Sequence, residues 1–340
     1  METVNCDLCG SKNYKIVTKQ TDLIHKTTKD YFSIVECENC GLNYTNPRPS
    51  PKEIGAFYSK NYTFHHVSGL RALLKSSIIG KLIKWIANSP FAYIFFFIPP
   101  ISNLLALQVK PKIQDPVIKY IKERKIKNFL DIGCGSGINS HFWGADSALI
   151  KCNRITEVFG CEPDESSRKF LNANGIHCWS RIEEVEKDKK FDLIRMNWSM
   201  EHVHEPSKYF EFFDNHLSSE GRAIIAVPNY KGLIYHLAPN CVELPIHLYH
   251  FSEDNLRSYS TKHNLELTSS VTFSHPGMFL FANEIGLLPS RSFSRGIIFA
   301  KKLQNILNIF DKFGMGNDIV VTIRKRTLNI ELIFTLLGKC

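Results

Sequence analysis

One glycine-rich loop constrains the fold of this chain more than any other segment. It reads Asp131-Ile-Gly133-Cys-Gly135-Ser-Gly137 and follows an apolar run that is typical of a buried strand. A dinucleotide-binding loop would read G-x-G-x-x-G, but position 138 is isoleucine, so the spacing here is G-x-G-x-G. We therefore expect the loop to bend closely round a ligand, without the spacing that suits a pyrophosphate. The Asp131 carboxylate at the strand tip is expected to meet a ligand ammonium group.

A second acidic residue points to a ribose in that ligand. Glu162 ends the next expected strand, 25 residues after Gly137. A carboxylate at this place can accept hydrogen bonds from both ribose hydroxyls, and it repels a 2′-phosphate. The predicted cofactor-binding residues are therefore Asp131, Gly133, Gly135, Gly137 and Glu162.

Strands and helices alternate through the second half of the chain. The expected helices are residues 164–175, with Asp164 as cap and Gly175 as stop, residues 206–217, closed by Gly221, and residues 251–264, capped by Ser252. The expected strands are residues 127–133, 157–162, 175–179, 191–197, 221–229, 265–273 and 317–326. This alternation predicts an α/β fold with a doubly wound, mostly parallel sheet.

Four of the ten cysteines form two matched pairs near the N-terminus. Cys6-x-x-Cys9-Gly and Cys37-x-x-Cys40-Gly lie 31 residues apart, and each spacing lets both sulfurs turn toward one point. Four thiolates satisfy Zn²⁺ with no open position, so we predict a structural zinc ribbon. Reduced cysteines that pack without metal are the alternative. The chain start lacks a basic stretch followed by an apolar one, so no secretory signal is expected and a cytoplasmic location is predicted.

Two segments between the cysteines and the glycine loop carry their own signals. Ser50, Pro51 and Glu53 form a capping-box pattern that predicts a helix to about residue 59. Residues 70–109 are rich in Ile, Leu and Phe, but lysines and prolines interrupt every apolar run before the roughly 20 residues that a membrane-spanning helix needs. We expect amphipathic helices there, which either cover the core or contact the inner membrane peripherally.

These motifs resemble those of the class I S-adenosylmethionine-dependent methyltransferases. DIGCGSG is similar to their first motif, and GCEPDESS to the second-strand motif with its ribose-binding acid. FDLIRMNWSMEHVHEPSKYF, GRAIIAVPN and HLYHFSEDNL resemble their later segments, and the cysteine pairs resemble the leader of a bacterial subgroup. The resemblance implies a Rossmann-like sheet of seven strands with one antiparallel strand. It also implies S-adenosylmethionine as the methyl donor and a small molecule or glycan precursor as the acceptor.

The resemblance also suggests how the chain is divided. We expect a zinc-ribbon module with its following helix at residues 1–66 and an apolar helical insert at residues 67–111. A methyltransferase domain should follow at residues 112–326, with a helical insertion near residues 275–312, and a tail at residues 327–340.

The residues that follow the fourth expected strand of the sheet are the candidates for chemistry. Methyl transfer is an in-line displacement at a sulfonium carbon, so a protein supplies alignment and, for a hydroxyl acceptor, a base. Asn197 is expected to contact the cofactor, and His202 is the expected base, beside Glu201. Alternatively, Glu201 and His202 only shape the loop or contact the methionine part of the cofactor. His247 and His250, just before a helix, form a second pair that could face the acceptor.

Absent motifs favour oxygen as the acceptor atom. The MNWS that ends the fourth strand is not the N/D-P-P-Y/F motif of amino-methylating enzymes, and no Pro-Cys nucleophile follows the fifth strand. Nucleotide-sugar C-methyltransferases carry an additional C-terminal domain, for which this chain looks short. Ubiquinone-type O-methyltransferases carry another glutamate three residues before the Glu-His pair, where this chain has Trp198. That departure argues against a metal-assisted mechanism of their type.

The net charge of +9 suits an anionic partner and leaves alternatives open. One is an RNA methyltransferase that holds phosphates with the ribbon and with basic residues of the C-terminal part. Few aromatic residues interleave with those charges, so nucleic acid is the less favoured partner. Another is a methyltransferase-like binding protein that has lost its chemistry. The basic residues in question are Arg291, Arg295, Lys301, Lys302, Lys312, Arg324, Lys325 and Arg326.

Overall fold

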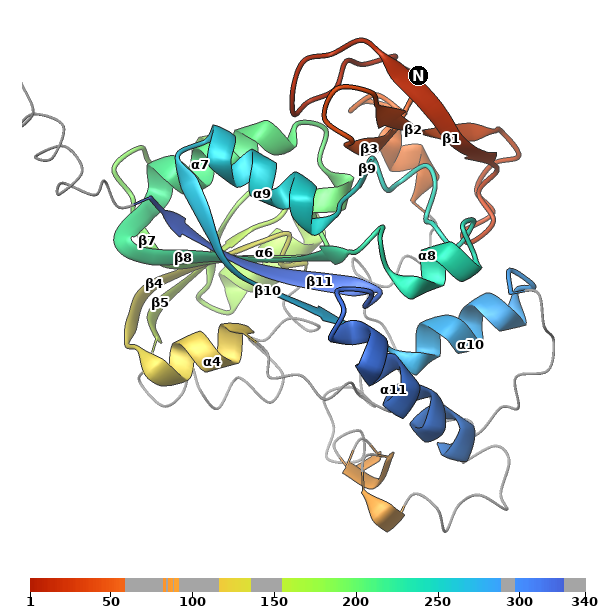
Figure 1. Ribbon diagram of the computed structural model, residues 1–340. Helices are drawn as coiled ribbons and strands as arrows, with labels where there is room; N and C mark the ends of the chain where they lie inside the picture. Colours follow the sequence, from red (N-terminus) through yellow and green to blue (C-terminus); the bar gives the residue numbers. More distant parts are fainter. Residues whose placement is uncertain are drawn as a thin grey trace, which may run out of the picture.

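The structure is a computed structural model that describes residues 1–58, 82–83, 85–87, 89–91, 116–135, 155–288 and 297–326. Figure 1 shows a central sheet with helices on both faces, a small β-rich N-terminal module above it, and two helices, α10 (Pro276–Glu284) and α11 (Ile297–Asp311), beside one end of it. None of the helices within these ranges combines the length and the apolar character that crossing a membrane requires.

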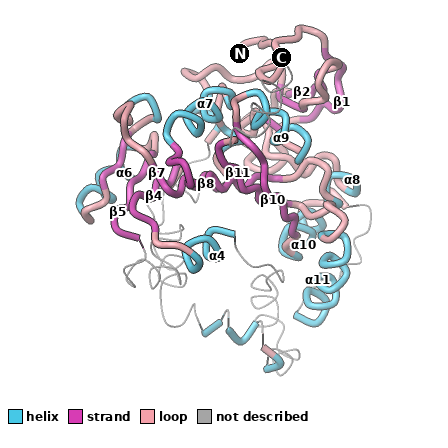
Figure 2. Tube along the Cα trace, turned by 60° about the vertical axis from the view of Figure 1, so that its left-hand side comes forward, coloured by secondary structure: helices cyan, strands magenta, loops and turns pink. Residues whose placement is uncertain are grey.

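The central sheet has seven strands in the order β10-β11-β8-β7-β4-β5-β6 (Figure 2). Strand β11 runs antiparallel to both of its neighbours, and the other strands are parallel to one another. The prediction of a Rossmann-like, doubly wound sheet with one antiparallel strand is confirmed. The strands are β4 (Ile126–Ile132), β5 (Ile155–Cys161), β6 (His177–Trp179), β7 (Phe191–Asn197), β8 (Leu217–Pro228), β10 (Leu265–Phe273) and β11 (Asp318–Lys325).

Successive residues of the central strands face opposite helices, as the pleat of a strand requires. Leu130 of β4 and Ile194 of β7 belong to the core shared with α7 (Pro206–His216) and α9 (Glu253–Lys262). Their neighbours Phe129 and Leu193 belong to the core shared with α4 (Pro116–Glu123) and α6 (Glu165–Ala173). In Figure 1 the pair α7 and α9 lies above the sheet and α4 below it.

Side-chain caps fix two of these helices at the predicted residues. The Asp164 carboxylate accepts a hydrogen bond from the Ser167 amide at 2.7 Å and begins α6. Ser252 begins α9 in a reciprocal capping box with Asn255. Both caps satisfy amide groups that the first turn of a helix leaves without a backbone partner.

Two predicted boundaries are wrong. The helix expected from Ser50 to residue 59 is a single 3-10 turn, η1 (Ile54–Phe57), although Glu53 does accept hydrogen bonds from the Ser50 amide and hydroxyl. Helix α7 ends at His216, within one residue of the predicted range 206–217, but Gly221 does not close it, because β8 begins at Leu217. Gly221 lies within that strand, where a Cβ atom would come within 2.7 Å of the Phe191 carbonyl oxygen.

The N-terminal module is built on a four-stranded antiparallel sheet with the order β1-β2-β3-β9. Its own strands are β1 (Tyr14–Gln20), β2 (Phe32–Cys37) and β3 (Asn43–Thr45). The fourth strand, β9 (Tyr249–His250), comes from the region just before α9. A segment that lies between β8 and α9 in the chain thus completes the module's sheet, and this segment contains a predicted site residue, His250.

Polar contacts and a common core also join the module to the main sheet. The Asp7 carboxylate accepts hydrogen bonds from the Ser207 amide of α7 and from the Tyr259 hydroxyl of α9, each at 2.9 Å. Cys6 and Tyr44 of the module lie in the same apolar core as α7 and α9. The predicted limits at residues 66, 67, 111 and 112 fall on residues that the structure does not describe, as does most of the insert at 70–109.

Candidate functional site

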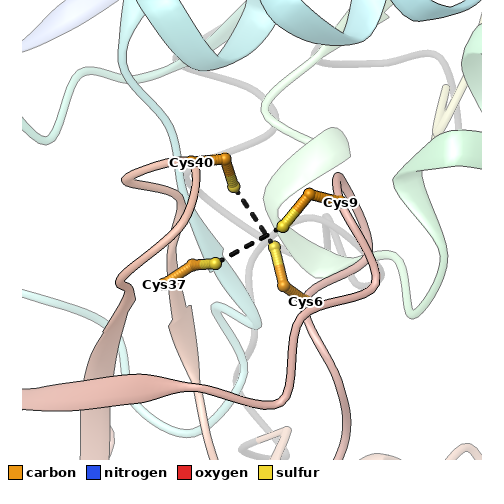
Figure 3. A group of neighbouring side chains, drawn as sticks. All are labelled: Cys6, Cys9, Cys37 and Cys40. Carbon is orange, nitrogen blue, oxygen red and sulfur yellow. Dashed lines mark hydrogen bonds between the residues drawn. The ribbon is translucent and has the colours of Figure 1, made fainter.

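The four module cysteines converge on one point (Figure 3). The sulfurs of Cys6 and Cys40 are 3.4 Å apart, those of Cys9 and Cys37 are 3.5 Å apart, and all four lie within 4.8 Å of one another. A tetrahedron of sulfurs about 2.3 Å from Zn²⁺ has edges of about 3.8 Å, so the observed spacing fits the ion closely. The donor set is four thiolates, which suits a structural zinc.

The two cysteine pairs have the same local geometry. Gly10 follows Cys9 and Gly41 follows Cys40, and both glycines have left-handed φ angles, of 76° and 71°. Each glycine amide donates to the carbonyl of the first cysteine of its pair, at 2.7 Å for Gly10 and 2.9 Å for Gly41. A side chain would strain these turns, so each glycine supports the approach of its two sulfurs.

The glycine loop and the second acid meet at the carboxyl ends of β4 and β5. Gly133 and Gly135 have left-handed φ angles, of 70° and 53°. The Gly135 amide donates a 2.8 Å hydrogen bond to Glu162, which is 3% exposed. The Glu162 carboxylate therefore lies beside the loop at the predicted ribose position. Gly137 is outside the described residues.

The loop also touches the segment that follows β7. A Cβ atom on Gly133 would come within 2.1 Å of the Ser199 hydroxyl oxygen. The Asn197 carbonyl accepts a hydrogen bond from the same hydroxyl at 3.0 Å. Trp198 between them has a left-handed φ of 48°, and its indole nitrogen donates to the Asp318 carboxylate at 2.9 Å. This strained turn brings the candidate catalytic residues next to the cofactor loop.

Asp131 has a partner that the sequence analysis missed. Arg195 lies opposite it on β7, and the guanidinium binds both carboxylate oxygens, with the Nε–Oδ1 distance at 2.8 Å. Both side chains are buried, at 2% and 1% exposure. The carboxylate expected to meet a ligand ammonium group is thus engaged within the sheet. The available signal was an arginine flanked by apolar residues in the middle of the strand FDLIRMN.

Three of the four predicted catalytic residues come together. A carboxylate oxygen of Glu201 and ring nitrogens of His202 and His247 all lie within 4.8 Å of one another. The two imidazole rings meet edge to face with centroids 4.7 Å apart. The Leu248 amide donates to the Glu201 carbonyl at 2.7 Å, and this bond holds the loop that carries His247 beside η5 (Met200–His202). We call Glu201, His202 and His247 the Glu-His-His cluster.

The hydrogen bonds of His202 indicate which ring nitrogen carries its proton. Nδ1 is 3.0 Å from the Ile246 carbonyl oxygen, which can only accept, so Nδ1 is the donor. Nε2 then carries the lone pair, and it lies 3.9 Å from the Glu201 carboxylate. The basic nitrogen of His202 therefore faces the other members of the cluster.

His250, the fourth predicted catalytic residue, has a structural role instead. Thr45 donates its only hydroxyl proton to the His247 carbonyl at 2.7 Å. The same hydroxyl oxygen is 3.1 Å from Nε2 of His250, so His250 is the donor in that contact. Burial lowers the pKa of His250 well below its usual value. A neutral His250 that ties β9 to the module fits this geometry.

Three further residues surround the Glu-His-His cluster, and the sequence analysis named none of them. The Tyr58 hydroxyl lies 3.3 Å from Nδ1 of His202. His25, from the loop between β1 and β2, binds Glu243 at 2.7 Å. No motif marks these residues, because His25 and Tyr58 reach the cluster from the module only through the folding of the whole chain.

Electrostatics link these residues to the cofactor loop. Burial raises the pKa of Tyr58, and the negative charges of Glu201, Glu243 and Glu162 raise it further. Burial alone would raise the pKa of Glu243, but the hydrogen bond from His25 and the nearby imidazoles hold it at about 2. The pKa of Tyr58 therefore responds both to Glu162, beside the glycine loop, and to Glu201 of the Glu-His-His cluster.

Comparison with known proteins agrees with this geometry. Residues 105–270 match a family model described as a methyltransferase domain. The histidine protein methyltransferase 1 homolog of Dictyostelium discoideum is 24% identical over 128 residues, which are 34% of this chain and 40% of that protein. This chain therefore spans about two fifths of the length of that curated relative.

Solved structures of methyltransferases are also similar to this chain. An S-adenosylmethionine-dependent methyltransferase from Clostridium acetobutylicum has a TM-score of 0.39 and 13% identity, over 62% of this chain and 89% of that one. One from Mesorhizobium loti has a TM-score of 0.41 and 11% identity, over 62% and 96%. The chain thus contains a methyltransferase domain, and its glycine loop and the order of its seven strands support a class I S-adenosylmethionine-dependent methyltransferase.

Proposed function

We propose that the protein transfers a methyl group from S-adenosylmethionine to a hydroxyl oxygen of a small molecule or of a saccharide or glycan precursor. The observation that carries this proposal is the Glu-His-His cluster beside the cofactor loop, with the basic nitrogen of His202 facing into it. An amine acceptor needs no such arrangement, whereas a hydroxyl is a poor nucleophile until its proton is removed.

The proposed step uses few protein groups. The donor is bound by the loop at Gly133 and Gly135 and by Glu162. The acceptor oxygen forms a bond to the methyl carbon while the carbon–sulfur bond breaks, and the electron pair of that bond stays on sulfur. The hydroxyl proton moves to Nε2 of His202, whose orientation is fixed by its bond to the Ile246 carbonyl. The products are the methyl ether and S-adenosylhomocysteine.

A transfer assay with labelled donor and fractionated cell extract tests the acceptor class. Label in a small glycan or lipid-linked fraction supports the proposal. Label in RNA supports the RNA alternative, and label on protein histidine would point to the activity named for the Dictyostelium relative. Two of the basic residues suggested for RNA already have partners, because Arg324 binds Glu266 at 2.9 Å and Lys301 binds the Ser89 carbonyl at 2.6 Å.

A variant pair tests the role of His202. His202→Gln should lower the transfer rate by about two to four orders of magnitude, the usual contribution of a general base, while the affinity for the donor stays unchanged. His177→Gln changes an exposed histidine at the start of β6 and should leave both quantities unchanged. Full transfer by the first variant would remove His202 from the mechanism.

We also propose that the protein works in the cytoplasm, in peripheral contact with the inner membrane through residues 70–109. The described parts of that segment support an amphipathic surface. Ala87 is buried against Ala300 of α11, while Trp85 and Phe91 are 57% and 54% exposed, with ring centroids 5.7 Å apart. Such a surface can bury its apolar side chains in a lipid interface.

A further inference from the structure

We propose that the Glu-His-His cluster is a second metal site, which binds a divalent transition-metal ion such as Zn²⁺ through the Glu201 carboxylate, Nε2 of His202 and the His247 imidazole. The three ligand atoms lie within 4.8 Å of one another and come from two separate segments of the chain. The site is distinct from the four cysteines of the module, which already make a complete donor set among themselves.

The orientation of His202 is the one that a metal ligand requires. Histidines that bind metals usually donate their other ring proton to a carboxylate or a backbone carbonyl, which fixes the tautomer and the direction of the free lone pair. His202 does this through Nδ1 and the Ile246 carbonyl at 3.0 Å. The lone pair at Nε2 is thereby directed to the side of the ring where Glu201 lies, 3.9 Å away.

Among the described residues, the Glu201 carboxylate has one oxygen without a hydrogen-bond partner, and a cation could bind there. This side chain is 1% exposed, and among the described residues its Oε2 atom has no hydrogen-bond partner. Burying an ionised carboxylate without a partner is strongly unfavourable. A dication at this position would compensate the buried charge and use the open oxygen.

Trp198 stands where ubiquinone-type O-methyltransferases carry a further glutamate, and the sequence alone therefore argued against a metal of their type. The tertiary structure supplies another ligand in its place, because the Leu248 amide binds the Glu201 carbonyl at 2.7 Å and so brings His247 to the cluster. His247 is 7% exposed, and its ring meets that of His202 edge to face with centroids 4.7 Å apart. The sequence signal was obscured because 45 residues separate His202 from His247.

The donor set indicates the class of ion and its use. Two imidazoles and one carboxylate suit Zn²⁺, Mn²⁺, Fe²⁺ or Ni²⁺ better than Mg²⁺ or Ca²⁺, which prefer oxygen ligands. Three protein ligands leave at least one position for an acceptor oxygen. This inference rests on the proposed methyl transfer to a hydroxyl, but it replaces the base role of His202, because an Nε2 atom that binds the ion has no lone pair left to accept a proton. Held by Glu201, His202 and His247, the ion would lower the pKa of an acceptor hydroxyl, and water would take that proton in place of a protein base.

Cobalt titration of the metal-depleted full-length protein tests the proposal. We expect two Co²⁺ per chain by equilibrium dialysis with elemental analysis. The four-cysteine site should give the intense near-ultraviolet absorption of cobalt thiolates, and the second equivalent should add only weak visible bands, since it has no sulfur ligand. Binding of one ion per chain, or thiolate absorption from both, would overturn the proposal without reference to any variant.

Matched variants assign the second ion to the cluster. Glu201→Gln, which keeps the size of the side chain, and His247→Ala should each weaken the second equivalent at least tenfold and leave the first unchanged. Cys37→Ser should do the reverse, and His177→Gln should alter neither. Two full-affinity ions in a folded Glu201→Gln protein would exclude the cluster as the site.

The same experiments separate this inference from the proposed function. A protein that binds the second ion but methylates no hydroxyl contradicts the proposed function alone. A protein that methylates a hydroxyl with only the cysteine-bound ion contradicts this inference alone.

Discussion

At the scale of single residues, the buried Glu162 and the half-buried Asp318 carry the clearest consequences. Glu162 accepts hydrogen bonds from the Gly135 and Asp164 amides, so it shapes the glycine loop at the position where a ribose is predicted. Asp318 lies under the turn at Trp198 and accepts the indole proton at 2.9 Å. A substitution of Glu162 should change the affinity for the cofactor, and a substitution of Asp318 should change how stability depends on pH.

Glu162→Ala should weaken the binding of S-adenosylmethionine by about ten- to a hundredfold, because hydrogen bonds to a charged group contribute roughly 1.5–3 kcal/mol. Gly135→Val should do the same, since valine is strained at a φ of 53°. Titration calorimetry measures both affinities. Glu165→Ala, which removes an exposed carboxylate paired with Lys169 on α6, is the matched control. Wild-type affinity in both test variants would contradict the assigned cofactor site.

Asp318 should make stability depend on pH. Burial raises the pKa of this carboxyl from 3.8 to about 7, although the bond from Trp198 opposes the shift. The folded state therefore keeps the proton to a higher pH than the unfolded chain does. This favours folding at low pH, and the contribution is lost as the pH rises from about 4 to about 7.

Asp318→Asn keeps an oxygen for the indole and has no charge to bury. Its Tm should exceed that of the wild type by several degrees at about pH 8, and the difference should vanish near pH 3.5. Scanning calorimetry at both pH values checks this, with the exposed Asp254→Asn as control. An equal gain at both pH values would show that titration of Asp318 is not the cause.

At the scale of elements, the pairing of β4 with β7 depends on a buried ion pair. Arg195→Leu should destabilise the protein by about 3–5 kcal/mol, because it leaves the Asp131 carboxylate buried without its partner. Changing both residues to leucine should cost less than Arg195→Leu alone. Urea unfolding of the two singles and the double measures the coupling. Additive losses would mean that the two side chains do not stabilise each other.

A second prediction at the scale of elements concerns the apolar segment at residues 70–109, part of which lies beside α11. Protein carrying Trp85→Ser and Phe91→Ser should no longer float with anionic vesicles, while the wild type should float, and less so as salt rises. Deletion of residues 70–109 should also abolish flotation. Tyr31→Ser, at an exposed aromatic of the module, is the control. If the wild type stays in solution at low salt, the segment covers the protein itself.

At the scale of the whole molecule, we expect the module and the main sheet to unfold as one cooperative unit. Strand β9 completes the module's sheet, Asp7 of the module bonds to α7 and α9, and one apolar core spans both parts. Cys37→Ser should therefore lower the Tm of the entire chain in a single calorimetric transition and reduce the zinc bound at the module. Cys241→Ser, at a buried cysteine far from the four, should leave the zinc content unchanged. Two separate transitions would show instead that the module melts alone.

The sequence by itself determined the local features of this protein. Glycine spacing, the cysteine pairs, the caps at Asp164 and Ser252, and the alternation of strands and helices are all readable within a few residues. They sufficed to predict the fold, the cofactor loop and the convergence of the four cysteines. Such features depend on backbone geometry and on short-range hydrogen bonds, which a linear pattern records.

Only the tertiary structure decided which distant side chains meet. It paired Asp131 with Arg195 through strand register, turned His250 into a tie between β9 and Thr45, and joined His247 to Glu201. It also brought His25 and Tyr58 from the module to the edge of the Glu-His-His cluster. These contacts follow from packing two sheets against one core, and no spacing along the chain encodes them.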